Sequence, residues 1–251
     1  MRRKTVKGIC HVCGKTTDLS FEHVPPRALS NTSPVKKYSG VELAQATGSL
    51  FNASFDGIRY KSSQRGSGFQ TICASCNSYF GRHYVSEYCE FSEALGSLLL
   101  SNPPSKEELG IHLEPRSLNG LAFIKHIVSN FCASSQTGTL FTCRDFLLDH
   151  KSNAFPSHLK VYLFAVPDPG PLFVTTGWTK MLMQDGSIVT ASYLASFPLG
   201  YSLVDTNETN TDPCSLGCDI TALAYRPWES ISCSLDLPYK TIENTFPAPR
   251  Y

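Results

Sequence analysis

Apolar residues recur at helical spacing in two long segments of the chain. In residues 77–100 and again in residues 116–133, apolar side chains follow one another at intervals of three and four positions. Such intervals place them on one face of a helix, so both segments are predicted to be amphipathic helices. The Asn-Pro-Pro-Ser run at residues 102–105 separates them, because proline lacks the amide hydrogen that a helix interior needs.

Shorter apolar runs bounded by turn residues predict β-strands. Two such runs, at residues 19–24 and 68–72, lie before the first predicted helix. Another five follow the second predicted helix, at residues 159–166, 172–176, 187–197, 201–204 and 220–225.

Residues 27–68 match neither pattern. They are rich in Ser, Gly, Asn and Lys and contain turn signals, so we expect a long irregular insertion there. The predicted fold class is therefore α+β. We expect a metal-stabilised N-terminal module over residues 1–101, a linker over residues 102–115 and a small α+β domain over residues 116–251.

Four cysteines form two Cys-x-x-Cys pairs. Cys10 and Cys13 precede the first predicted strand, and Cys73 and Cys76 follow the second. Four thiolates in two such pairs can complete the tetrahedral shell of a structural zinc ion, and Gly14 allows the tight turn that this geometry requires. The alternative is four unrelated thiols, but the paired spacing favours a zinc site.

The two halves of the chain differ in charge. Residues 1–100 contain twelve Lys and Arg and seven Asp and Glu, a balance of +5, whereas residues 101–251 contain ten and fourteen, a balance of −4. A basic N-terminal half suits a partner that carries phosphate groups. The difference is modest, and charge alone does not identify a nucleic-acid-binding protein.

Neither a membrane span nor a secretory signal is expected. No apolar run reaches the roughly 20 residues that cross a bilayer. The basic start of the chain is not followed by an apolar stretch. Together with cysteines at metal-binding spacing, these features favour a reducing, cytoplasmic location, with the other cysteines as free thiols.

Glu22, His23 and Asn77 are the candidate site residues between the cysteine pairs. Glu22 and His23 end the first predicted strand, and Asn77 begins the first predicted helix. Cleavage of a phosphodiester needs an activated water and a cation on the phosphate. A histidine can accept the water's proton, and carboxylate and amide oxygens can hold the cation. Neighbours on a regular strand point to opposite faces, so Glu22 and His23 would share a site only where the strand is irregular.

The order of these motifs resembles the HNH endonuclease family. Cys-x-x-Cys, Glu22-His-Val-Pro-Pro and Cys-x-x-Cys-Asn with Gly81 four residues later carry the resemblance, which covers roughly residues 8–90. It implies a ββα-metal fold that is stabilised by a zinc ion bound to four cysteines. It also implies hydrolysis of phosphodiester bonds in DNA with Mg²⁺ or Mn²⁺.

The resemblance assigns a role to each candidate residue. His23 matches the general base, Glu22 the metal ligand at a position where the family commonly has Asp, and Asn77 the second metal ligand. The family's middle asparagine, which orients the loop of the base, has no clear match. Asn52 and Gln64 are the candidates for it.

Four basic residues are the candidate contacts to nucleic acid: Arg59, Lys61, Arg65 and Arg82. Taken singly, each is better explained as a solvated surface charge. The expected partner is DNA or RNA, with a regulatory protein or a second copy of the chain as further candidates.

The alternative to the nuclease is a non-catalytic zinc-stabilised module that binds nucleic acid or protein. A third interpretation, an effector of bacterial defence against phage, rests on analogy alone.

Overall fold

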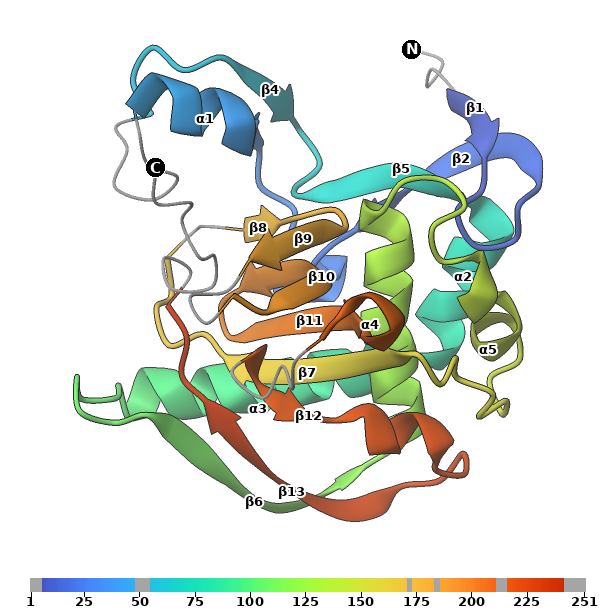
Figure 1. Cartoon of the computed structure of the whole chain (residues 1–251). Coiled ribbons are helices and arrows are strands. Elements are labelled where there is room, and N and C mark those ends of the chain that lie inside the picture. Colours follow the sequence, from blue (N-terminus) through green and yellow to red (C-terminus); the bar gives the residue numbers. More distant parts are fainter. Residues whose placement is uncertain (1–5, 48–54, 171–172, 183–185, 211–215, 242–251) are drawn as a thin grey trace.

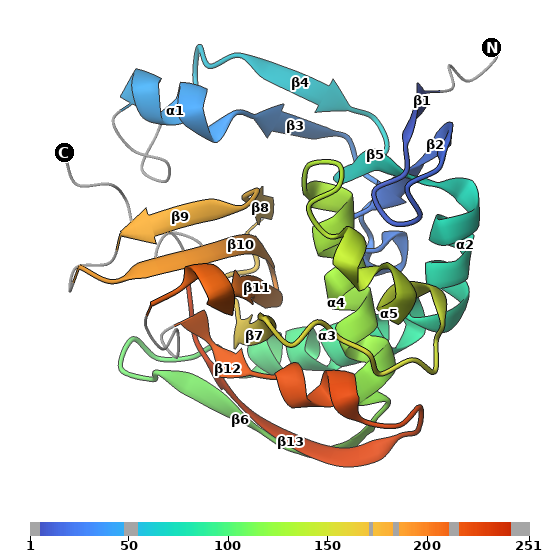
Figure 2. The same ribbon diagram turned by 45° about the vertical axis from the view of Figure 1, so that its right-hand side comes forward.

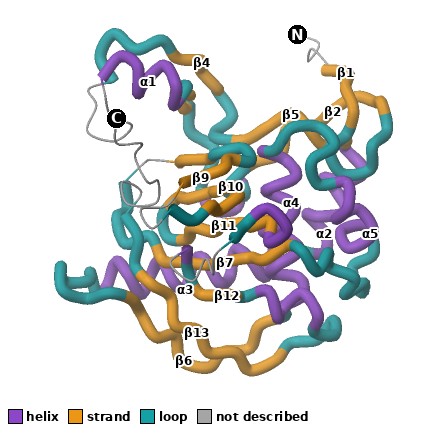
Figure 3. The backbone as a smooth tube through the Cα atoms, viewed as in Figure 1, coloured by secondary structure: helices purple, strands orange, loops and turns teal. Residues whose placement is uncertain are grey.

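Helices and strands are mixed along the whole chain, which confirms the predicted α+β class (Figures 1 and 3). The structure is a computed structural model that describes residues 6–47, 55–170, 173–182, 186–210 and 216–241. No helix within these ranges is long and apolar enough to cross a membrane.

A three-stranded antiparallel sheet opens the fold. Its strands are β1 (Val6–Ile9), β2 (Thr16–His23) and β5 (Gly68–Cys73), in the order β1-β2-β5. Helix α2 (Ala74–His83) follows β5 without a loop and packs against β2 and β5. The two predicted N-terminal strands are confirmed, and the first predicted helix begins at Ala74, three residues earlier than Asn77. Together β2, β5 and α2 form a ββα unit.

The described residues between β2 and β5 form an arm that extends from the body of the molecule (Figures 1 and 2). After the short helix η1 (Arg27–Leu29), β3 (Val35–Tyr38) and β4 (Tyr60–Ser63) pair as an antiparallel ribbon, and α1 (Gly40–Thr47) lies between them in sequence. The expectation of an irregular insertion was therefore wrong. Each strand has only four residues, too few for the alternation of polar and apolar residues to be recognised in the sequence.

Two long helices continue the chain, as the apolar spacing predicted. α3 (Val85–Ser101) is the second part of the predicted helix at residues 77–100, which breaks at Tyr84. α4 (Gly120–Ser134) starts four residues later than predicted, because residues up to Leu118 belong to a strand. The side chain of Asn119 caps α4 by accepting a hydrogen bond from the amide of Ala122 (3.1 Å).

The C-terminal half is built on a six-stranded antiparallel sheet of order β12-β7-β11-β10-β8, with β9 also paired to β10. Four of the five strands predicted here form, within one to two residues where described. The fifth prediction, at residues 220–225, was wrong: Thr221–Tyr225 is the 3-10 helix η5. The strands are β7 (Leu159–Ala165), β8 (Phe173–Thr175), β9 (Thr179–Leu182), β10 (Ile188–Ser196), β11 (Leu199–Asp205) and β12 (Cys218–Asp219).

A separate two-stranded ribbon joins β6 (Gly110–Leu118) to β13 (Ile231–Pro238). The predicted linker at residues 102–115 therefore contains the first six residues of a paired strand. The short helices η2 (Phe141–Cys143), α5 (Arg144–Leu148) and η3 (Thr206–Glu208) complete the described elements.

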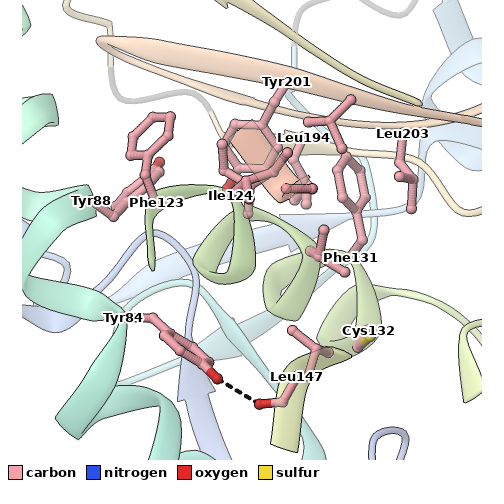
Figure 4. Packing of buried hydrophobic residues seen from close by; sticks show 14 of the residues in the cluster. Tyr84, Tyr88, Phe123, Ile124, Phe131, Cys132, Leu147, Leu194, Tyr201 and Leu203 are labelled. Carbon is pink, nitrogen blue, oxygen red and sulfur yellow. Dashed lines mark hydrogen bonds between the residues drawn. The ribbon is translucent and has the colours of Figure 1, made fainter. Parts of the chain in front are cut away.

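One hydrophobic cluster extends from the four cysteines through α3 and α4 to the six-stranded sheet. Helix α4 lies at its centre and is buried on every side from Gly120 to Ala133. Figure 4 shows Phe131 of α4 close to Tyr201 of β11, with ring centroids 5.5 Å apart. The predicted N-terminal module and C-terminal domain thus share a core.

Candidate functional site

The four cysteines of the two pairs come together at one end of the first sheet. Cys10 and Cys13 lie in the turn after β1, Cys73 ends β5, and Cys76 lies in the first turn of α2. Their sulfur atoms all lie within 4.8 Å of one another, and the Cys13 and Cys73 sulfurs are 3.9 Å apart. Tetrahedral zinc with Zn–S bonds of about 2.3 Å needs sulfurs about 3.8 Å apart. This cluster could therefore bind a metal ion such as zinc.

The surroundings of Cys10 favour negative charge on sulfur. A hydrogen bond from the thiol of Cys76, followed by backbone amides of Cys13 and Cys73, lowers the pKa of Cys10 to about 4 despite its burial. The Cys73 amide donates to the Cys10 sulfur at 3.3 Å. Hydrogen bonds to the sulfur stabilise the thiolate, which is the form of cysteine that binds a metal, so the donor set fits a cation.

Glu22 lies on β2 opposite Phe69 of β5 and is buried in the sheet–helix unit. A register shift between Ser20 and Glu22 interrupts the pairing of β2 with β5, as a β-bulge does, and such a bulge re-aims side chains. The Glu22 side chain is 6% exposed, and burial raises the pKa of its carboxyl to about 7. A bound cation would offset this cost by stabilising the charged form.

His23 is half-buried and lies in a different environment from Glu22. Its ring meets the Phe21 ring edge-on, with centroids 4.9 Å apart. Burial lowers the pKa of His23, and the positive charges of Arg27 and Arg65 lower it further, while a hydrogen bond with the Arg65 backbone raises it. The net effect is a neutral imidazole at neutral pH, the form that can accept a proton.

Asn77 ties α2 to β2 beside Glu22. Its amide nitrogen donates to the Ser20 hydroxyl (3.1 Å) and to the Phe21 carbonyl (3.2 Å). Both bonds use the nitrogen, so the amide oxygen is the atom that could ligate a cation. The three predicted site residues thus lie where β2, β5 and α2 meet.

Asn31 holds the loop that follows His23, and the sequence did not identify it. Its amide donates to the carbonyls of Pro25 (2.6 Å) and Ser67 (2.8 Å), and its side-chain oxygen accepts from the Ser67 amide (2.7 Å). It therefore joins the loop after His23 to the segment before β5. This is the loop that Asn52 or Gln64 was expected to orient. Of the two candidates, Gln64 is exposed in a turn, and Asn52 lies outside the described residues. No local motif marks Asn31, because two of its three hydrogen bonds are to Ser67, 36 residues away.

Two glycines allow this close packing. A Cβ on Gly66 would lie 2.4 Å from the Asn31 carbonyl oxygen, and one on Gly68 would lie 2.0 Å from the Glu22 carbonyl oxygen. Gly66 also has φ +83°, in the left-handed region that favours glycine. The approach of the strands at His23 therefore depends on both glycines.

Replacing Asn31 by alanine should loosen the His23 loop without removing metal from the cysteines. Three hydrogen bonds are lost and buried backbone groups lose partners, so we expect a loss of about 2–3 kcal/mol in the free energy of unfolding. Urea denaturation and zinc analysis of the purified variant measure both effects. Asn153→Ala, at an exposed asparagine outside this loop, is the control, and equal stability of the two variants would contradict the role given to Asn31.

The four basic residues predicted to contact nucleic acid do not lie together. Arg59 directly precedes β4, Lys61 belongs to β4 and Arg65 lies in the turn between β4 and β5. Arg82 belongs to α2, which lies beyond the opposite end of β5 (Figures 1 and 2). The structure thus groups three of these residues on the arm and separates Arg82 from them.

No family model, curated protein or solved structure matches the chain. The arrangement of the site itself therefore carries the functional argument. It combines a cluster that can hold a metal ion with a neutral histidine and a buried carboxyl on β2, and with an asparagine of α2 that is hydrogen-bonded to the same strand.

Proposed function

We propose that the chain is a metal-dependent endonuclease that hydrolyses phosphodiester bonds in DNA. The observation that supports this proposal is that β2, which bears Glu22 and His23, pairs with β5 and is joined to Asn77 of α2 through the Phe21 carbonyl. One group there can accept a proton, and two can offer oxygen to a hard cation. The resemblance of the motifs to HNH endonucleases agrees with this chemistry.

In this mechanism His23 acts as the general base. Its lowered pKa keeps the imidazole neutral, so it can take a proton from the water that attacks phosphorus. Glu22 and Asn77 would hold Mg²⁺ or Mn²⁺, which supplies Lewis-acid stabilisation of the charge on the phosphate and the leaving oxygen. Asn31 keeps the His23 loop in place.

The four-cysteine cluster would hold a structural zinc ion. Four sulfur ligands leave no open coordination position for a substrate, as is typical of structural sites. The zinc would fix the end of β5 and the start of α2, and Asn77 follows Cys76 directly. Zinc binding and catalysis would thus use adjacent residues for different purposes.

The proposal is tested with His23→Ala in a plasmid-nicking assay. We expect the wild type to nick plasmid DNA with added Mg²⁺ or Mn²⁺ and to stop in EDTA. The variant should lose nicking at least about 10²-fold, the usual size of a general-base contribution, and keep its zinc. His112→Ala, at an exposed histidine on β6, is the matched control and should cut normally. Undiminished cleavage by His23→Ala would refute the assignment.

A second candidate function is a zinc-stabilised module that binds nucleic acid without cutting it. The burial of Glu22 favours it, since a carboxyl with a pKa of about 7 is only partly ionised at neutral pH. The same assay separates the two candidates. A pure binder would shift the mobility of the DNA with every divalent metal and yield no product.

A further inference from the structure

The two faces of the β3–β4 ribbon differ in chemistry. Lys37 and Lys61 are directly paired across the strands and so lie on one face. Tyr38 and Tyr60 are paired on the other face, where the Lys36 ammonium lies 4.7 Å from the Tyr60 ring centroid. One face therefore presents lysines, and the other presents aromatic rings with a lysine over one of them.

The lysine face is attached to the sheet beside His23. The Lys37 ammonium donates a hydrogen bond to the Gly68 carbonyl and lies 5.8 Å and 5.6 Å from the ring centroids of Phe21 and Phe69. Gly68 is the residue paired with His23 across β2 and β5. Lys37 is thus an anchor of the arm, and Lys61 opposite it is exposed.

Two arginines extend the positive charge of this face to His23. Arg65 lies with its guanidinium 5.0 Å from the Phe21 ring centroid, and its backbone hydrogen-bonds with His23. Arg27 begins η1, four residues after His23, and is near enough for its charge to act on the His23 ring as well. Both arginines are exposed.

Little negative charge opposes these cations. Along the described part of residues 27–67, the acidic side chains are Glu42 in α1 and Asp56 in the turn before β4. The arm is thus a positively charged surface that ends at the proposed general base, and its charge is complementary to phosphate.

We propose that the arm face formed by Arg27, Lys61 and Arg65 binds the phosphate backbone of double-stranded DNA and leads it to His23. This inference rests on the proposed function and adds the substrate form and the residues that hold it. Binding of single strands relies on open aromatic rings on which bases stack. Here the aromatic pair of the ribbon lies on the opposite face, and Arg65 covers Phe21. A positively charged face without exposed aromatic rings is suited to contacts with the phosphate backbone of DNA, which do not depend on the base sequence.

The test is a DNA-binding titration in a His23→Ala background, which avoids cleavage during the measurement. The probe is a fluorescein-labelled DNA duplex of mixed sequence, followed by anisotropy over a series of salt concentrations. The test variant carries Arg27→Gln, Lys61→Gln and Arg65→Gln. The control variant carries Lys36→Gln, Lys106→Gln and Lys151→Gln, which removes the same charge from exposed positions off this face.

Each phosphate contact contributes about 0.9 to the slope of log K against log salt. We therefore expect the test variant to lose about 3 from this slope and to bind at least about tenfold more weakly. The control variant should bind like the parent. Equal behaviour of the two variants would overturn the proposal, and so would tighter binding of a single strand of the same length that depends on the same three residues.

The outcomes also separate this inference from the proposed function. Duplex binding through this face without any cleavage by the wild type, in Mg²⁺ or Mn²⁺, would refute the nuclease and support the inference. Conversely, if the wild-type chain cuts DNA and the triple substitution in the otherwise wild-type chain cuts and binds like its control, the inference fails and the nuclease stands.

Discussion

Replacing Cys73 by serine should release zinc and lower the free energy of unfolding by about 5 kcal/mol or more. A structural zinc ion exists only in the folded state, so its binding free energy contributes directly to folding. Cys73 is 4% exposed, ends β5 and directly precedes the first turn of α2. Its loss would remove a ligand and place a hydroxyl among buried sulfurs. Urea denaturation and zinc content by atomic emission check the prediction.

The matched control is Cys89→Ser. Cys89 is a buried free thiol in α3, outside the four-cysteine cluster. Its substitution should cost only about 1–2 kcal/mol and leave the zinc content unchanged. If both variants lose similar stability, or if Cys73→Ser keeps one equivalent of zinc, the cluster is not a structural metal site.

Glu22→Gln should raise the free energy of unfolding by about 3 kcal/mol at pH 8 and abolish cleavage. Burial raises the pKa of Glu22 from its ordinary value of 4.5 to about 7. The folded state therefore holds this proton more tightly than the unfolded chain does. Stability from this group is complete below pH 4.5 and falls as the pH rises to about 7, by about 1.4 kcal/mol for each unit of pKa difference. Glutamine has the shape of the protonated acid and carries no such cost.

The pH dependence makes this prediction specific. The advantage of Glu22→Gln over the wild type should shrink from about 3 kcal/mol at pH 8 to about 2 kcal/mol at pH 6. Denaturation of zinc-loaded protein in the absence of Mg²⁺ measures it. Asp18→Asn, at an exposed carboxyl on the same strand, should show no comparable gain. A variant that is no more stable than the wild type at pH 8 would show that the Glu22 carboxyl is well solvated.

The parts of the site that were predictable from sequence rest on local patterns. The spacing of Cys10 and Cys13 identified one half of the four-cysteine cluster, and the run of apolar residues identified α3 and α4. Sequence neighbours also fixed Glu22 and His23 on one strand. In each case the residues concerned lie a few positions apart or repeat with a regular period, so their pattern can be recognised in the sequence.

The parts that were missed depend on contacts between distant segments. Asn31 binds Ser67, which lies 36 residues away, and Lys37 reaches Gly68 across the arm. The strands of the arm are short, and β6 pairs with β13 from the other end of the chain. At residues 220–225 a β-like composition forms a 3-10 helix because tertiary packing overrides such weak preferences.

The C-terminal end of α4 shows how closely the two halves of the chain are joined. Its carbonyls at Cys132 and Ala133 accept hydrogen bonds from His11 (3.1 Å) and Thr71 (2.7 Å), which belong to the cysteine-bearing half. The last carbonyls of a helix have no partner within the helix, so these side chains complete it. A fragment that ends near residue 101 would lose α4 and leave the inner face of α3 without cover. We therefore expect that the metal-binding half does not fold by itself. A graft of this half onto another protein would have to include α4.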